Sequence, residues 1–472
     1  MAMKTLTSDA DERGTLGRRE ILLGGLAGAV LSGAAARSAS AQVPAAVPAG
    51  PVAGVGRQAP DAPATGAATV AQHRVEVAGP HGVVAAGHPL ASMAGLRMLM
   101  QGGTAADAAV AVMAVLNVVE PWASGAAGNG FATCMDGKTG KISALAFAGA
   151  APQLLEDTAS AADLTAGPKA VVTPGAFGGW IELARRHGRL PLSVLLEPAI
   201  GYARDGHPLD PSIAQTIARQ QAMLTRFPTT AAIYFPDAKP PAPRAMFRNL
   251  PLARSFQILA DAETAALKAG ASRDRALNAA YDCFYSGSIA QEMDRFSRAN
   301  GGWLRLDDMQ RYRPKWVEPV ATRYRGLDVI CSPLTSRTGL ETCEQLNLME
   351  GFDIGSLPAD SPQALHLIAE CIKITKADVY RYAADPASSP TPVATLISKE
   401  FANQRRRLID PARAIVFPTG ADIGNAGAVA RSPVAAGSVP GDTTNISIVD
   451  GDGNAVGVTT TLGGGFGAGV IM

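Results

Sequence analysis

Near the end of the chain, two threonines open a segment typical of a β-strand: Thr443 and Thr444, preceded by Asp442. If the peptide bond between Asp442 and Thr443 is cut, Thr443 gains a free α-amino group beside its own hydroxyl. Such an amine titrates close to neutral pH and can accept the hydroxyl proton. The threonine would then act as nucleophile and general base together. β-Branched residues favour strands in any case, so the pair alone indicates only an ordinary strand.

The strand that would position Thr443 belongs to a predicted hairpin. Residues 444–450 and 455–462 alternate in polarity, and the turn-forming segment 451–454 joins them. This pattern is typical of two antiparallel strands. The threonine pair is therefore expected at the start of the first strand.

Two helices are predicted before this hairpin in the chain. The first covers 89–100 and ends at Gly102–Gly103; the second starts at Thr104, with Asp107 placed for a capping box. The run 108–116 is apolar on nearly every side, which predicts a helix buried all round. After the glycine-rich connector 124–130, a hairpin is predicted from 131–135 and 142–147. Further helices are expected at 178–187, 194–205, 212–224, 251–269, 273–297, 338–349, 362–383 and 393–406.

Three segments carry other expectations. The proline-rich stretch 226–250 is interpreted as a surface excursion, 323–332 as a strand, and 414–440 as irregular. The six histidines are scattered and form no metal-binding pattern. We therefore expect no metal and no cofactor.

The composition excludes several classes of partner. Lys and Arg number 42 against 41 Asp and Glu, and aromatic residues make up 5%, so nothing favours nucleic-acid binding. The five cysteines show no CxxC spacing, and buried free thiols are the simplest interpretation. One pair, such as Cys331 with Cys343, could close in an oxidising compartment.

The N-terminal segment is interpreted as a targeting signal. Arg18–Arg19 precede a Gly/Ala/Leu stretch, and small residues at 39–41 suit a signal peptidase, a pattern that resembles a twin-arginine export signal. The apolar stretch is too short for a stable membrane span. We expect a signal peptide over 1–41, cleavage after Ala41, a Pro/Ala/Gly-rich linker over 42–74, and a periplasmic or secreted product.

The folded part resembles the γ-glutamyltransferase family (γ-glutamyltranspeptidase, glutathione hydrolase) of N-terminal-nucleophile hydrolases. The likeness runs from about Val83 to the last residue. The motifs that carry it, in chain order, are 102–111, Val118–Pro121 with Ser124–Gly125 and Gly128–Phe131, Pro174–Gly175, Gly188–Pro191, Leu196–Ile200, Gly301–Gly302, Tyr324–Gly326, Leu348–Asp353, Asp385–Pro386, Thr443–Thr444, Asp452–Val456 and Thr461–Leu462.

This resemblance implies an α+β fold, a four-layer αββα sandwich. It also implies a precursor that cuts itself between Asp442 and Thr443 into a large-subunit-like region, 75–442, and a small-subunit-like region that starts at 443. Thr443 would attack a γ-glutamyl amide such as glutathione, and water or an amino-acid or peptide acceptor would release the acyl group. Thr461 occupies the position of a threonine that hydrogen-bonds the nucleophile's amino group.

The chain departs from the family pattern in three places. Ala148 stands where the family has an arginine that grips the donor carboxylate, and Gly463 replaces a substrate-contacting asparagine. The family's small subunit continues well past the position of Met472, so 443–472 is expected to be only its start, with the sandwich incomplete or finished by a separate chain. Two alternatives stay open: an acylase of the same family for another amide, such as a glutaryl or β-lactam side chain, or an inactive truncated remnant.

Overall fold

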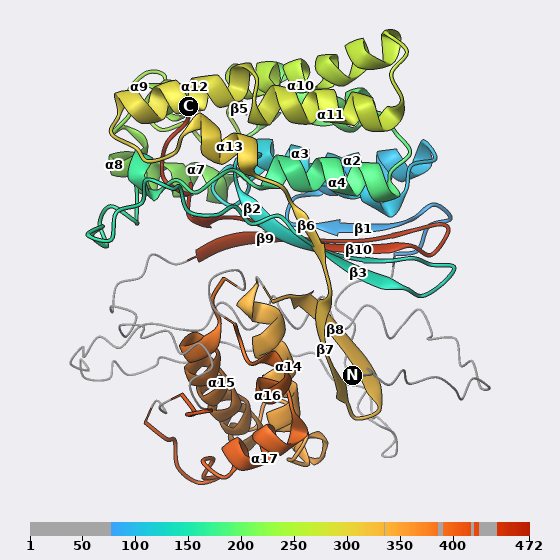
Figure 1. Cartoon of the computed structure of the whole chain (residues 1–472), viewed down its shortest axis with the longest axis vertical. Helices are drawn as coiled ribbons and strands as arrows, with labels where there is room; N and C mark the ends of the chain where they lie inside the picture. Colours follow the sequence, from blue (N-terminus) through green and yellow to red (C-terminus); the bar gives the residue numbers. More distant parts are fainter. Residues whose placement is uncertain (1–76, 335, 386–389, 417–419, 424–440) are drawn as a thin grey trace, which may run out of the picture.

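The computed structural model describes residues 77–334, 336–385, 390–416, 420–423 and 441–472 (Figure 1). The expected signal peptide and linker lie outside these ranges, as does most of the segment 414–440. Among the described residues, no helix is long and apolar enough to cross a lipid bilayer.

A six-stranded antiparallel sheet lies at the centre of the molecule (Figure 1). Its strands alternate between side chains buried on one face and less buried on the other, as the period of two in a strand requires. The two strands expected at the end of the chain lie inside this sheet and not at its edge. In spatial order the strands are β1 (Gly82–Ala86), β9 (Gly441–Asp450), β10 (Ala455–Gly464), β2 (Asn129–Met135), β3 (Ile142–Ala146) and β6 (Lys315–Val317).

Helices cover one face of the sheet in two tiers (Figure 1). The inner tier holds α3 (Ala105–Val119), every residue of which is buried, because it packs against neighbouring helices and against β9 and β10. The capping box of Thr104 and Asp107 is present as predicted. The other helices on this side include α2 (Pro89–Met100), α4 (Ala176–His187), α5 (Leu192–Leu195), α6 (Glu197–Asp205), α10 (Leu250–Lys268), α11 (Arg273–Tyr285), α12 (Ser288–Ala299) and α13 (Leu306–Arg311).

The other side of the sheet carries a hairpin and a second group of helices (Figure 1). The hairpin of β7 (Pro319–Tyr324) and β8 (Leu327–Pro333) contacts β2 and β3, and its far side packs on α14 (Arg337–Met349). The layers therefore follow the order helix, sheet, hairpin, helix, as expected for an αββα arrangement. The remaining elements of this side are η2 (Ile354–Ser356), α15 (Pro362–Tyr382), α16 (Val393–Leu396) and α17 (Lys399–Arg406).

The hairpin turn between β9 and β10 is tied to the start of α3. One carboxylate oxygen of Asp450 accepts the N–H of Ala105 at 2.9 Å, and the other accepts the N–H groups of Asp452 and Asn454, both at 3.0 Å. A carboxylate at a helix N-terminus is favoured by the unpaired N–H groups there. Asp450 thus ties the end of β9 to the start of the buried helix α3.

The interpretation of 226–250 as a surface excursion is wrong in part. This segment contains α9 (Pro228–Tyr234) and the short strand β5 (Met246–Phe247), which pairs with β4 (His207–Pro208). Tyr234, Phe235 and Phe247 are buried in a small separate core with Phe466 from the end of the chain. This contact joins residues more than 200 positions apart, so local composition could not indicate it.

Several expected elements are divided in two. The helix expected over 273–297 breaks at Ser286–Gly287 into α11 and α12, and the strand expected over 323–332 is the β7–β8 hairpin. In that hairpin Arg325 and Gly326 both have positive φ, the geometry of a two-residue turn. The remaining breaks separate α5 from α6, α7 (Pro211–Arg219) from α8 (Gln221–Leu224), and α16 from α17; a short helix, η1 (Pro168–Ala170), was not anticipated.

Candidate active site

The register of β9 and β10 brings the two candidate threonines together. Thr461 lies directly opposite Thr443 in the antiparallel pair. The next pairing joins Gly463 to Asp442, so Leu462 is an extra residue in β10, a β-bulge. Gly463 has a φ of 90°, a conformation that glycine adopts without strain.

A chain of hydrogen bonds links the threonine pair to the peptide bond before Thr443. The Thr443 hydroxyl donates to Thr461 Oγ1 at 3.2 Å, and the Thr461 hydroxyl donates to the carbonyl oxygen of Asp442 at 2.7 Å. The N–H of Gly463 donates to Thr461 Oγ1 at 2.8 Å. A hydroxyl has one proton and two lone pairs, so these three bonds use all of Thr461's capacity. The bulge thus fixes one rotamer of Thr461.

This arrangement polarises the carbonyl group that precedes the nucleophile candidate. Hydrogen bonding to the Asp442 carbonyl oxygen favours negative charge on that oxygen, as a donor of an oxyanion hole does. The neighbouring hydroxyl of Thr443 is the nucleophile nearest in sequence, and its proton already points to Thr461. The geometry therefore suits attack of Thr443 on its own N-terminal peptide bond.

The two threonines lie on the face of the sheet away from α3. Thr443 is exposed and Thr461 half-buried, whereas Thr444, the next residue of β9, is buried on the helix side. On the same open face the Thr459 hydroxyl donates to Asn445 Oδ1 at 2.7 Å. The Thr443 side chain is therefore exposed on the face of the sheet away from α3.

On the buried side, Thr444 is tied to the end of α3. Glu120, the C-cap of that helix, accepts a hydrogen bond from the Thr444 hydroxyl. A Cβ atom placed on Gly87 would lie 2.5 Å from Oε1 of Glu120 and 2.5 Å from Oγ1 of Thr444, so a larger residue there would have to displace one of these side chains. Burial raises the pKa of Glu120, and the Thr444 bond partly opposes that rise. Glu120 thus holds Thr444, the residue next to Thr443.

The carboxyl group of Asp442 is partly buried at the candidate cleavage point. Burial raises its pKa, so its neutral form is favoured relative to a carboxyl in water. Gly465 lies against this side chain: a Cβ there would come within 2.7 Å of Asp442 Oδ2. The glycine-rich end of β10 therefore leaves room for the Asp442 side chain.

Comparison with known proteins identifies the family. The sequence profile described as Gamma-glutamyltranspeptidase matches residues 91–472. The chain belongs to the gamma-glutamyltranspeptidase family. This is an enzyme family, and the relatives of this chain are named hydrolases and acylases.

Three relatives show the range of this family. The chain is 35% identical to the acylase ACY 1 proenzyme of Pseudomonas sp. (strain SE83), covering 83% of this chain and 67% of the relative. It is 30% identical to the glutathione hydrolase proenzyme of Bacillus subtilis (strain 168), covering 84% and 66%. The crystal structure of cephalosporin acylase from Bacillus halodurans superposes with a TM-score of 0.70 at 30% identity, covering 83% and 67%. The chain spans about two thirds of the length of these relatives.

Ala148 lies at the same end of the sheet as the threonine pair. Thr461 faces Asn129 in β2, and the Asn129 side chain accepts the N–H of Gly149 at 2.7 Å. Ala148 itself is exposed. Adjacent strands lie about 4.8 Å apart, so the end of β3 is about 14 Å from β9. Ala148, which stands where the resemblance placed an arginine, therefore lies two strands beyond β10 at this end of the sheet.

Two residues of this region were missed as site residues in the sequence. Glu120 and Asn129 both lie in motifs that carry the resemblance, Val118–Pro121 and Gly128–Phe131. Their contacts, with Thr444 and with the Gly149 N–H, depend on strands brought together from distant parts of the chain. The motifs were the only available signal.

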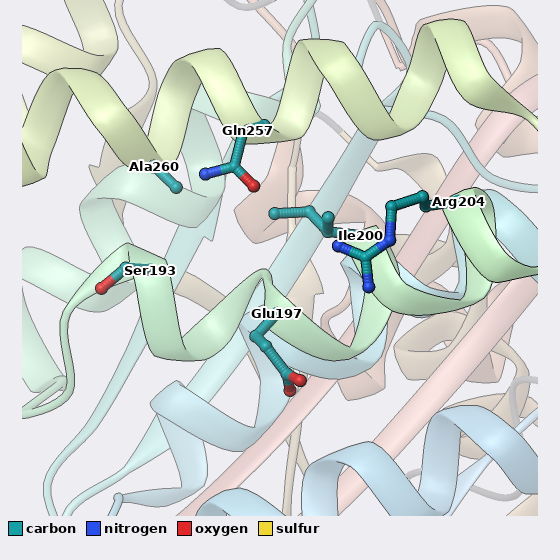
Figure 2. A pocket seen from close by; sticks show the side chains of 6 residues that line it. All are labelled: Ser193, Glu197, Ile200, Arg204, Gln257 and Ala260. Atoms are coloured by element: carbon teal, nitrogen blue, oxygen red, sulfur yellow. The ribbon is translucent and has the colours of Figure 1, made fainter.

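The cavity shown in Figure 2 lies away from the threonine pair, between α6 and α10. It has a volume of about 120 Å³ and a lining that includes Glu197 and Arg204. Glu197 pairs with Arg97 at 2.7 Å, and Arg204 pairs with Asp205 at 2.8 Å, so both charges already have partners. Over the part of the chain that the structure describes, no cluster of three or more His, Cys, Asp or Glu side chains is arranged to hold a metal ion.

Proposed function

We propose that this gamma-glutamyltranspeptidase family chain is an acyl-transfer enzyme that acts through Thr443 after self-cleavage between Asp442 and Thr443. The observation that supports this most directly is the hydrogen-bonded chain from Thr443 through Thr461 to the Asp442 carbonyl. Processing would separate a region over 75–442 from a region that begins at 443.

The first step is an acyl shift within the precursor. Thr443 Oγ1 forms a bond to the carbonyl carbon of Asp442 while its proton passes to Thr461. The Thr461 proton passes to the carbonyl oxygen in the same movement. The bond between that carbon and the Thr443 nitrogen then breaks, the carbonyl re-forms, and the proton released from its oxygen passes to the nitrogen. Water hydrolyses the resulting ester, which leaves a new carboxylate at Asp442 and a free amine at Thr443.

In turnover, the new amine of Thr443 takes the hydroxyl proton and the oxygen attacks the substrate amide. The amine of the substrate leaves and an acyl-enzyme ester remains on Thr443. Water or an amino-group acceptor releases the acyl group. We propose that Thr461, which already contacts the Thr443 hydroxyl, supports the amine and keeps it beside the oxygen.

We propose γ-glutamyl amides, including glutathione, as the substrate class. The glutathione hydrolase relative supports this class. The second candidate is an amide with another acyl group, such as a glutaryl or β-lactam side chain. The exposed Ala148 favours it, because no bidentate charged contact to a donor carboxylate forms from that position. The acylase relatives support the same alternative.

We propose that the protein is exported. The twin arginines at 18–19, the apolar stretch after them and the small residues at 39–41 support a twin-arginine signal cleaved after Ala41. N-terminal sequencing of the product from a host with this export system tests the proposal. A product that keeps the first forty residues would refute it.

The deciding experiment is expression of the full chain followed by denaturing electrophoresis. Two bands are expected, with the smaller one starting at Thr443 by N-terminal sequencing. Thr443→Ala should give a single band and no turnover. Thr459→Ala is the matched control, since it removes a hydroxyl from the same face of β10 without touching Thr443. A parent chain that stays uncut would support an inactive remnant and overturn the proposal.

If the chain is cut, mass spectrometry of the products separates the two substrate classes. The purified protein is incubated with glutathione and with glutaryl and β-lactam amides in parallel. Release of glutamate or transfer of a γ-glutamyl group supports the first class. Turnover of only the other amides supports the second.

A further inference from the structure

Two cysteines lie side by side on the far side of the sheet from α3. Cys331 in β8 and Cys343 in α14 have their Sγ atoms 3.8 Å apart. Cys343 is fully buried, whereas Cys331 is half-buried. Both belong to the small core around β7, α14 and α15, and neither forms a disulfide in the structure.

The backbone between the two cysteines holds them close. They are twelve positions apart, at the end of a strand and inside the helix that follows it. A Cβ atom on Gly339 would lie 2.2 Å from the carbonyl oxygen of Ser332, so the first turn of α14 sits directly on the end of β8. A disulfide needs a sulfur separation of about 2.05 Å, so the Sγ atoms must approach by only about 1.8 Å.

We propose that Cys331 and Cys343 are a modification site that closes to a disulfide on reaction with a low-molecular-weight disulfide such as oxidised glutathione. The Cys331 thiolate attacks one sulfur of that reagent and releases one thiol. The Cys343 sulfur then attacks the Cys331 sulfur of the mixed disulfide and releases the second thiol. Two electrons pass to the reagent, and the two protein thiols lose their protons.

The surroundings suit this order of attack. Cys331 is the more exposed of the two residues, and the hydrogen bond from the Cys343 thiol lowers the pKa of Cys331. The pKa of Cys343 is raised, chiefly by that same bond and by burial. An accessible, more acidic thiol with a buried partner behind it is the usual arrangement for thiol–disulfide exchange. Among the other cysteines, burial raises the pKa of Cys134 and of Cys371 to about 12.

The test uses the reduced full chain incubated with millimolar oxidised glutathione, with reduced glutathione as the reference. The number of thiols titrated after denaturation should fall from five to three. Trypsin cuts at Arg337, between the two cysteines, so peptide 326–337 should stay joined to 338–373 until a reductant is added. A Cys371→Ser background makes the linkage unambiguous, because 338–373 also contains Cys371.

Closure should raise the melting temperature by about 5 °C, because the disulfide lowers the conformational entropy of the unfolded chain over this loop. Cys343→Ser should abolish that rise and trap a glutathione adduct on Cys331. Cys283→Ser, which alters a half-buried cysteine on α11, should change neither result. Retention of all five thiols, linkage between other cysteines, or an unchanged melting temperature in the oxidised parent would overturn the proposal.

The site is independent of the acyl-transfer proposal. A Thr443→Ala chain, which cannot cut itself by the proposed route, should close the same pair with the same peptide linkage. Loss of self-cleavage and loss of disulfide formation are therefore distinguishable.

Discussion

The hydroxyl of Thr461 lies 2.7 Å from the carbonyl oxygen of Asp442, one residue before the proposed nucleophile. Antiparallel pairing alone would set Thr461 opposite Thr443 only. The bulge at Leu462 moves the following residues out of register and lets Gly463 N–H hold the Thr461 oxygen in place. One hydroxyl thereby contacts both the attacking group and the bond to be attacked.

Removal of that hydroxyl should slow self-cleavage. Thr461→Val keeps the side-chain shape but loses the donor to the Asp442 carbonyl, and loss of one such donor typically lowers a rate about 100- to 1,000-fold. Thr461→Ser should retain most of the rate. The measurement is the appearance of the smaller band over time, with Thr459→Val as the control. Cleavage of Thr461→Val at the parent rate would show that the contact has no role.

Glu120→Gln should change how stability depends on pH. Burial raises the pKa of Glu120, so the folded chain keeps a proton there that the unfolded chain loses above about pH 4.5. Stability is therefore lost as pH rises from 4.5 toward the raised value, and the glutamine variant escapes this loss. In denaturant unfolding, the free energy of unfolding of the variant should increase relative to that of the parent between pH 4.5 and pH 7.

The exposed Glu156 provides the control for that experiment. Glu156→Gln should show the same change in the free energy of unfolding between the two pH values as the parent. If Glu120→Gln loses stability relative to the parent as pH rises, the pKa of Glu120 is not raised in the folded chain.

Ala148→Arg should increase selectivity for acyl groups that carry a carboxylate. The position is exposed at the end of the sheet that holds Thr443. A charge-assisted bond to a carboxylate contributes about 1.5–3 kcal/mol, which corresponds to roughly 10- to 100-fold in kcat/KM. The measurement compares γ-glutamyl and uncharged acyl amides. Ala150→Arg, also exposed and two residues along, is the control, and an equal effect from both variants would argue against a specific contact.

Asp107→Ala should destabilise the fold without touching the site. This buried carboxylate accepts the N–H groups of Thr104 and Arg189, both at 2.9 Å, and so joins the start of α3 to the loop after α4. Loss of a buried charged acceptor for two backbone donors should cost about 3 kcal/mol. Asp136→Ala, in an exposed turn, should cost much less. Equal unfolding midpoints for the two variants would refute this account.

Local pattern predicted the elements whose signals lie close together in sequence. The helix over 89–100, the capping box at Thr104 and the hairpin after Thr444 depend on neighbours within a few residues, and the structure confirms all three. The burial of Phe235 and Phe247 depends on Phe466, far along the chain, so proline content suggested a surface segment instead. Breaks such as that at Gly287 were missed because the helical pattern continues on both sides of them.

The candidate site was predicted only as far as residue types allow. Thr443, Asp442 and Thr461 could be named, because the resemblance places them in the family's motifs. The contact between Thr461 and the Asp442 carbonyl could not, since it depends on a one-residue bulge. The place of Glu120 depends on α3 lying under β9, which is a tertiary contact.

The position of β9 in the sheet has a consequence for the fate of a nicked molecule. β9 pairs with β1 on one side and β10 on the other, and β10 pairs in turn with β2. The last residues also dock on α9, where the Thr230 hydroxyl accepts the N–H of Ile471 at 2.9 Å. A cut in the backbone at the start of β9 would leave the hydrogen bonds between β9 and its neighbouring strands intact. The two fragments would stay associated under native conditions and would dissociate only in denaturant.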